Sequence, residues 1–360
     1  MSSINHLAQE MIFKILTLLP VLSLLRCKAV CKLWKSIISD PHFIQAHFTI
    51  SRNKQPPFSV LRYVPSGASE GLYIDTRGED SVKLTLPACF SGMRFRVRSY
   101  NGLVTLADIH VGLFYIWNPL TRLFKMLPQS KLGLHLSGVR LFVTNLGFGF
   151  DSVSKDYKIL RVRVGRYLCD GNEVSVTVAE VYSVNAGSWK EFRVPEEMQR
   201  FANFPFSKCV FVDSGVWYIE GYKEIMSFDL HDEVFGLYPY PKTGGRMSEI
   251  LDFDGSVAVI RSVGGRASFL SLWKLDGVGE NFSWTKMFNI EPDLKIDFIL
   301  LYLGERQFFV EDYDAGCFFY DDRKKGDKKL PPLAGAISGC TSAFQFTGSL
   351  VSLQGFARFE

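Results

Sequence analysis

Histidines, cysteines and acidic residues could do chemistry here, and their spacing matches no known catalytic or metal-binding pattern. The six histidines are His6, His42, His47, His110, His135 and His231. His42 and His47 lie five residues apart with no acid between them, whereas zinc proteases use two histidines four apart that flank a glutamate. The glycine clusters lack the lysine and following helix that phosphate binding requires. We therefore expect no catalytic residues, no metal site and no cofactor.

The seven cysteines are dispersed, odd in number and without a C-x-x-C pair. We expect free, buried thiols and a reducing compartment, the cytosol or nucleus. The apolar run 11–25 ends in Arg26-Cys27-Lys28 without a cleavage site, so we expect neither a signal peptide nor a membrane span. The net charge is only +4 with no long basic run, so no nucleic-acid partner is expected.

The amino-terminal stretch 7–43 is rich in helix-forming residues, unlike the rest of the chain. Apolar side chains at Leu7, Met11, Ile15 and Leu18 recur at three- and four-residue spacing, which predicts one face of a helix that stops at Pro20. A second short helix is expected after a Ser23 cap, and a third over 31–39. Asp40-Pro41 predicts an N-cap that starts one more turn. The apolar side chains exceed what three short helices can bury, which indicates either a docking surface or a cap on the remaining chain.

The order and spacing of these residues resemble an F-box. The matching positions are Leu7, Glu10, Ile15, Leu16, Leu19, Pro20, Leu24, Leu25, Arg26, Val30, Cys31, Lys32, Trp34 and Phe43. The resemblance implies docking to a Skp-type adaptor and, through it, to a cullin and a RING protein. The adaptor-binding residues expected from it are Leu7, Ala8, Glu10, Ile15, Leu16, Leu19, Pro20, Leu24, Leu25, Arg26, Val30, Cys31 and Trp34. Ala8 departs from the family, which usually has proline there to set the turn before the first helix.

Two alternating hairpin patterns fill the chain after three short strands in 58–86. The first pattern occurs at 95–108, 146–162, 209–221, 251–263, 299–313 and 344–356, and the second at 114–128, 179–195, 225–241, 271–290 and 317–332. Asn101-Gly102 and Asp254-Gly255 predict two-residue hairpin turns. The aromatic markers Tyr182, Phe228, Trp273 and Phe319 are 46, 45 and 46 residues apart, and a longer gap after Trp117 predicts an insertion around 129–144.

Four strands per repeat of about 45 residues predict an all-β propeller, with six four-stranded blades, behind the small all-α domain. The last blade is incomplete, so strands from 58–86 are expected to close the ring. Two packed antiparallel sheets are the alternative architecture; a closed ring is preferred because it protects strand edges.

The segments 101–106, 115–128, 147–162 and 179–192 resemble the F-box-associated β-propeller of plant F-box proteins. The predicted organisation is an F-box over 1–47, a linker over 48–57 and a propeller over 58–360. The resemblance implies a substrate receptor of an SCF-type ubiquitin ligase, similar to the S-locus F-box group, whose partners are style ribonucleases. The alternatives are a propeller lectin or hydrolase with a helical cap, and an F-box protein that works outside a ligase. Candidate substrate-binding loops lie around Arg166, Phe201 and Arg246 (166–172, 197–206 and 242–246).

Overall fold

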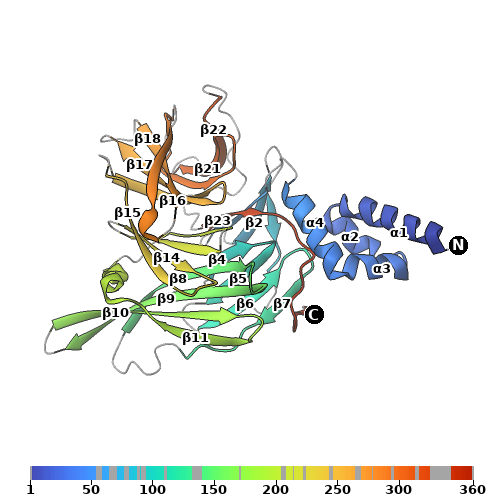
Figure 1. The fold of residues 1–360 in the computed structure, drawn as a ribbon, viewed down its shortest axis with the longest axis horizontal. Helices are drawn as coiled ribbons and strands as arrows, with labels where there is room; N and C mark the ends of the chain where they lie inside the picture. Colours follow the sequence, from blue (N-terminus) through green and yellow to red (C-terminus); the bar gives the residue numbers. More distant parts are fainter. Residues whose placement is uncertain are drawn as a thin grey trace.

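The structure is a computed structural model of the chain. It describes residues 2–53, 59–64, 71–76, 81–86, 90, 95–108, 112–131, 140–169, 172–203, 208–213, 215–221, 224–242, 246–263, 269–277, 279–292, 296–312, 316–324 and 342–358. Four helices lie at one end of the molecule and sheets make up the rest (Figure 1).

The amino-terminal helices are α1 (Ser2–Thr17), α2 (Val21–Cys27), α3 (Lys32–Ser39) and α4 (Pro41–Asn53). The turn expected after Asp40 is in fact a helix of 13 residues, so the domain has four helices rather than three, and residues 48–53 of the expected linker are helical. Asp40 caps α4 as predicted, because its Oδ1 accepts hydrogen bonds from the backbone N–H groups of His42 and Phe43.

The expected Ser23 cap is wrong. The second helix begins at Val21, directly after an extended Pro20, and Ser23 lies inside it. Proline in an extended conformation can precede a helix without the capping side chain that the sequence suggested. The third helix is preceded by Cys31, whose Sγ accepts a hydrogen bond from the Trp34 N–H.

The strands form six separate antiparallel sheets, which are the blades of the propeller. Blade one contains β23 (Ser342–Phe346), β1 (Ser59–Val64), β2 (Gly71–Thr76) and β3 (Val82–Leu84). Blade two contains β4 (Phe95–Tyr100), β5 (Leu103–Asp108), β6 (Leu113–Asn118) and β7 (Leu123–Met126), with β24 (Ala357–Arg358) on its outer edge. Blade three contains β8 (Arg140–Asp151), β9 (Asp156–Cys169), β10 (Asn172–Ser183) and β11 (Ser188–Arg193).

The other three blades repeat this order. Blade four contains β12 (Cys209–Val212), β13 (Val216–Glu220), β14 (Glu224–Asp229) and β15 (Phe235–Pro239). Blade five contains β16 (Arg246–Phe253), β17 (Ser256–Val263), β18 (Phe269–Asp276) and β19 (Ser283–Ile290). The described part of blade six contains β20 (Phe298–Tyr302), β21 (Gln307–Asp312) and β22 (Gly316–Asp321). Two short 3-10 helices, η2 (Glu196–Asn203) and η3 (Gly279–Asn281), lie between strands.

The ring closes by combining strands from both ends of the domain, as predicted. Each innermost strand contacts the innermost strand of the next blade, in the cyclic order β4, β8, β12, β16, β20, β23 and back to β4. The closing strand β23 pairs with β1 in antiparallel register, with Phe344 opposite Leu61. The expected hairpin over 344–356 is wrong, because only residues 344–346 belong to a strand. Residues 347–356 form no strand and bring Leu350 to the helices.

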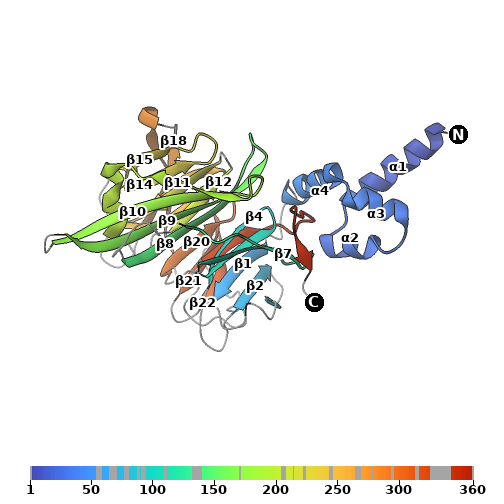
Figure 2. The ribbon, with the colours of Figure 1, turned by 90° about the horizontal axis from the view of Figure 1, so that it is seen from below.

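The predicted hairpin turns at Asn101-Gly102 and Asp254-Gly255 are confirmed, since both residues of each pair have positive φ. The extra length before Tyr182 is not confined to the expected insertion. Three strands of blade three are unusually long, and the β9–β10 ladder continues to Cys169 opposite Asn172. Figures 1 and 2 both show this long hairpin extending away from the helices.

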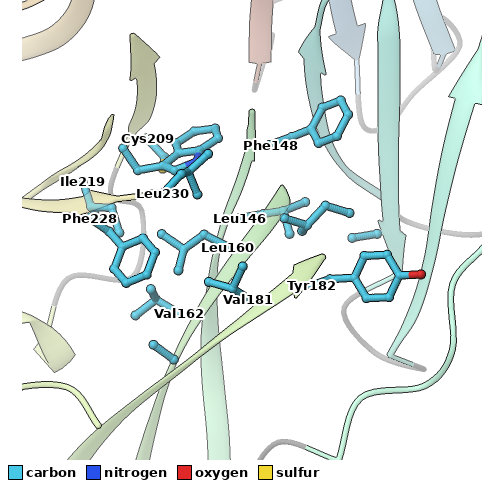
Figure 3. Close-up of a cluster of buried hydrophobic side chains, with 14 of the residues drawn as sticks. Leu146, Phe148, Leu160, Val162, Val181, Tyr182, Cys209, Ile219, Phe228 and Leu230 are labelled. Carbon is cyan, nitrogen blue, oxygen red and sulfur yellow. The ribbon is translucent and has the colours of Figure 1, made fainter. Parts of the chain in front are cut away.

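Neighbouring blades bury apolar side chains between their faces. In Figure 3, Leu160 and Val162 of blade three lie beside Ile219 and Phe228 of blade four. Gly147 allows this close approach, because an added Cβ would lie 2.7 Å from the ring of Trp217. The ring therefore has a series of cores between its blades.

Candidate functional site

The helical domain has a small apolar core that its own helices do not complete. Leu16, Leu24 and Phe43 are buried together, and Leu350 joins them from the segment that follows β23. Because a domain of about 50 residues encloses little volume, one added leucine is a large share of its core. The helices are therefore joined to the propeller through a shared core.

The 347–356 segment is held against the propeller by a buried asparagine. Asn118 Nδ2 donates hydrogen bonds of 2.9 Å to the carbonyl oxygens of both Ser349 and Val351. Gly102 lies against the same segment with φ +73°, and an added Cβ there would lie 2.6 Å from the Thr347 oxygen. These contacts fix where Leu350 enters the helical core.

The structure separates the expected adaptor-binding residues by burial. Leu16 and Leu24 are buried in the core, where their side chains stabilise the domain, and their part in adaptor binding stays a prediction. Leu19, Leu25 and Trp34 are half-buried against that core. The exposed members are Ala8, Glu10, Ile15, Pro20, Arg26, Val30 and Cys31. The backbone of Leu7 lies in α1.

Three exposed apolar residues lie on one face of α1 and directly after its last residue. Met11, Ile15 and Leu18 are 64%, 58% and 60% exposed, at spacings of four and three residues. Val30, between α2 and α3, is 65% exposed. The helical spacing in the sequence predicted that Met11 and Leu18 share a face with Ile15. The F-box match did not include these two residues. Figure 1 shows α4 nearest to the sheets and the start of α1 farthest from them.

Ala8 lies inside α1, which begins at Ser2. In this chain, position 8 therefore does not form a turn before the first helix. A proline there would lack the N–H for the helical ladder and would clash with the preceding turn. Alanine instead lets the helix extend toward the amino terminus.

A cavity of about 510 Å³ lies between the helices and the mouth of the propeller's central channel. Helices α2 and α4 supply one wall, and the innermost strands supply the other. Its floor includes Arg98, Lys208 and Cys209. A concave, largely apolar pocket at a domain junction with a few polar groups is typical of a ligand site.

Two cations at the floor connect the innermost strands around the channel. Arg98 Nε donates to the Leu146 oxygen at 2.6 Å and Nη1 to the Val97 oxygen at 2.8 Å. Lys208 Nζ bonds Glu249 Oε2 at 3.0 Å and the carbonyl oxygens of Ile299 and Leu300 at 3.1 Å. Lys208 therefore joins blades four, five and six.

Burial dominates the acid–base behaviour of the channel. It raises the pKa of the Cys209 thiol to about 11, against the opposing effect of Arg98. It also raises the pKa of Glu220 to about 7, with a further contribution from Glu249. A thiol with a raised pKa is a poor nucleophile, so this site is not suited to cysteine catalysis.

The rim of the cavity carries an ion pair between the two domains. Arg52 of α4 bonds Asp213 at the end of β12, and the Tyr100 hydroxyl donates to the other oxygen of Asp213 at 3.0 Å. Asp252 lies close by, and its pKa is raised to about 7 by burial and by Asp213, against the effects of the Gly255 N–H and Arg52.

The three residues that mark the candidate substrate-binding loops lie in regular secondary structure. Arg166 is part of strand β9 rather than a loop, Phe201 lies in η2, and Arg246 is the first residue of β16. The cavity is lined instead by residues of the innermost strands β4, β12, β16, β20 and β23 and of helices α2 and α4. The structure thus does not bring Arg166, Phe201 and Arg246 to the cavity. The sequence did not predict the cavity, because the residues that line it come from separate blades.

Among the described residues, no three His, Cys, Asp or Glu side chains are grouped to hold a metal ion. Cys27, Cys31, Cys209 and Cys317 form no disulfide with one another or with other described residues. Only the last two are buried, so the expectation of buried thiols is wrong for Cys31, which is exposed. In the described parts of the chain, no helix has the length and apolar character needed to cross a membrane.

Comparisons with known proteins address both domains. An F-box domain family model matches residues 4–45, and an F-box associated beta propeller domain model matches residues 66–302. The chain is 26% identical to an F-box/kelch-repeat protein of Arabidopsis thaliana over 98% of this chain and 97% of the relative. It is also 26% identical to F-box protein CPR1 of Arabidopsis thaliana, over 76% of this chain and 70% of the relative.

A solved structure, a protein of unknown function from Bacteroides caccae, is similar with a TM-score of 0.42 and 11% identity over 80% of this chain and 98% of that one. The propeller assignment rests on the strand pairing and on the family models. Since the second family model alone covers more than half of the sequence, this chain belongs to the F-box proteins that carry an F-box-associated β-propeller domain.

Proposed function

We propose that this protein is the substrate-recognition subunit of an SCF-type ubiquitin ligase. The helical domain binds a Skp-type adaptor, which connects it to a cullin and a RING protein, and the propeller binds a protein target. The observation that carries the proposal is the exposed apolar stripe of Met11, Ile15 and Leu18, on a domain whose core is already filled. Exposed apolar side chains that gather on one surface are characteristic of a protein interface.

The subunit contributes proximity rather than bond chemistry. It holds the target near a ubiquitin-loaded enzyme that is recruited elsewhere on the complex, so the reaction proceeds between partners on one scaffold. The shared core around Leu350 supports this role, because a firm junction keeps the distance between adaptor and target constant. The proposal places the protein in the cytoplasm or nucleus, where such ligases work.

The test is adaptor binding by variants that change exposed residues only. Ile15→Asp and Val30→Asp should each weaken binding to a purified Skp-type adaptor at least about tenfold, since a charge at an apolar interface core remains unpaired. Both residues are more than half exposed, so the fold should survive. The matched control is Val153→Asp on the propeller, where valine is equally exposed at 65%. Wild type that does not bind the adaptor would refute the proposal.

A further inference from the structure

Arg98 at the floor of the cavity is a buried cation without a carboxylate partner among the described residues. Its side chain is 9% exposed, and its recorded contacts are the carbonyl oxygens of Leu146 and Val97, the Cys209 thiol and the Phe344 ring. A guanidinium has five N–H donors, and the two carbonyls accept from only two of its nitrogens. Burying a charge without a counter-ion is costly, so such groups are often found where a ligand supplies the opposite charge.

The carboxyl groups around the cavity are either paired with other cations or largely uncharged. Glu249 binds Lys208, and Asp213 binds Arg52. Asp252 has a pKa of about 7, so near neutral pH a large share of its carboxyl groups carry no charge. Among the described residues that surround the cavity, no carboxylate therefore balances the positive charge of Arg98.

We propose that this cavity binds a small organic anion, with a carboxylate or a comparable acidic group on an apolar body, whose acidic group pairs with Arg98. The volume of about 510 Å³ is in the range of small-molecule sites. Phe211, Trp217 and Phe344 line the same space and suit an apolar or aromatic body. Helices α2 and α4 form part of the wall, which favours a compact ligand over a long peptide.

Such a ligand would contact both domains at once. Phe48 and Ser51 belong to the helical wall, whereas Arg98 and Phe344 belong to the innermost strands. Its binding would therefore stiffen the junction between the adaptor-binding helices and the propeller. This site does not depend on the proposed ligase role, and its test needs no adaptor.

The experiment compares 4-phenylbutyrate with its neutral, equally shaped amide, 4-phenylbutyramide, by calorimetric titration of the full chain. A charge-assisted hydrogen bond to Arg98 should make the carboxylate bind about tenfold tighter than the amide. Arg98→Gln should remove this preference and Arg98→Lys should retain part of it. Arg193→Gln, which removes an exposed arginine on the outer strand β11, should retain all of it.

The comparison in the wild-type protein stands even if Arg98→Gln does not fold. Equal affinity for the acid and the amide would overturn the proposal, as would the absence of carboxylate binding at millimolar concentration. If a folded Arg98→Gln protein still binds the acid more tightly than the amide, the anion binds elsewhere and the proposal is overturned. A structure of the complex should show the carboxylate within hydrogen-bond distance of the Arg98 guanidinium.

Discussion

Asp252 is a carboxyl group near the channel mouth whose surroundings shift its pKa. Asp252 lies next to Asp213 and Asp254, which disfavour its ionised form, while the Gly255 N–H and Arg52 favour it. Burial is the largest of these influences, so the net pKa is raised to about 7 from an ordinary value of 3.8. Asp252 therefore holds its proton in the folded protein at pH values where the unfolded chain has released it.

Asp252→Asn should make the folded protein more stable at pH 7.5, by on the order of 3 kcal/mol. The folded state binds an extra proton between about pH 4 and pH 7, so the wild-type stability falls as pH rises through this interval. Asparagine cannot ionise and can still accept the hydrogen bond from the Gly255 N–H. Urea unfolding at several pH values should show a flatter profile for the variant and little difference near pH 4.

The exposed Asp232→Asn serves as the control for charge removal, and its profile should follow that of the wild type. If the unfolding free energy of Asp252→Asn falls between pH 4 and 7 as steeply as that of the wild type, another group causes the pH dependence.

Among the elements of the fold, the segment 347–356 connects the two domains. It leaves the ring after β23, binds Asn118 through two carbonyl oxygens and inserts Leu350 into the core of the helices. Asn118 comes from the segment 115–128 that resembles the F-box-associated propeller, so this motif residue positions the helical domain. The helices at the start of the chain therefore depend on residues some 300 positions later.

Leu350→Ala should destabilise the helical domain by about 2–4 kcal/mol, because it leaves a cavity in a small core. Hydrogen exchange of α2 amides should accelerate, and adaptor affinity should fall although no adaptor contact is changed. The exposed neighbour Gln354 supplies the control, since Gln354→Ala should alter neither property. Unchanged exchange in α2 would mean that the helices fold independently of this segment.

The whole propeller depends on strand β23. The innermost strands form a closed cycle, and β23 is the member that combines the late part of the domain with β1. Without it, β1 would expose an unpaired edge to other chains.

Removal of residues 342–360 should abolish the cooperative unfolding transition and promote aggregation through the edge of β1. Removal of residues 357–360 takes away only the two-residue strand β24 and should change stability by less than about 1 kcal/mol. The Leu350→Ala protein keeps β23 and so separates ring closure from the contact with the helices. Thermal unfolding of the two truncated proteins and of Leu350→Ala can be followed by circular dichroism. Equal unfolding midpoints for the three proteins would refute the role of β23.

The sequence by itself predicted the first three helices, most of the hairpins and the closed ring. Helical spacing, the proline at position 20 and the Asn-Gly and Asp-Gly turns are local signals, because they arise from backbone geometry within a few residues. The repeat of about 45 residues then predicted the number of blades and the closure with the first strands. The F-box motif correctly indicated the helical domain.

Only the tertiary structure decided which side chains of that domain are exposed and where the chain forms its cavity. Leu16 and Leu24 match the motif as well as Ile15 does, yet they are buried, because helix packing and Leu350 determine which face is covered. Arg98, Lys208 and Asp252 belong to three different blades and meet only when the ring closes. Contacts between residues so far apart leave no local spacing in the sequence, so the three-dimensional fold alone brings this site together.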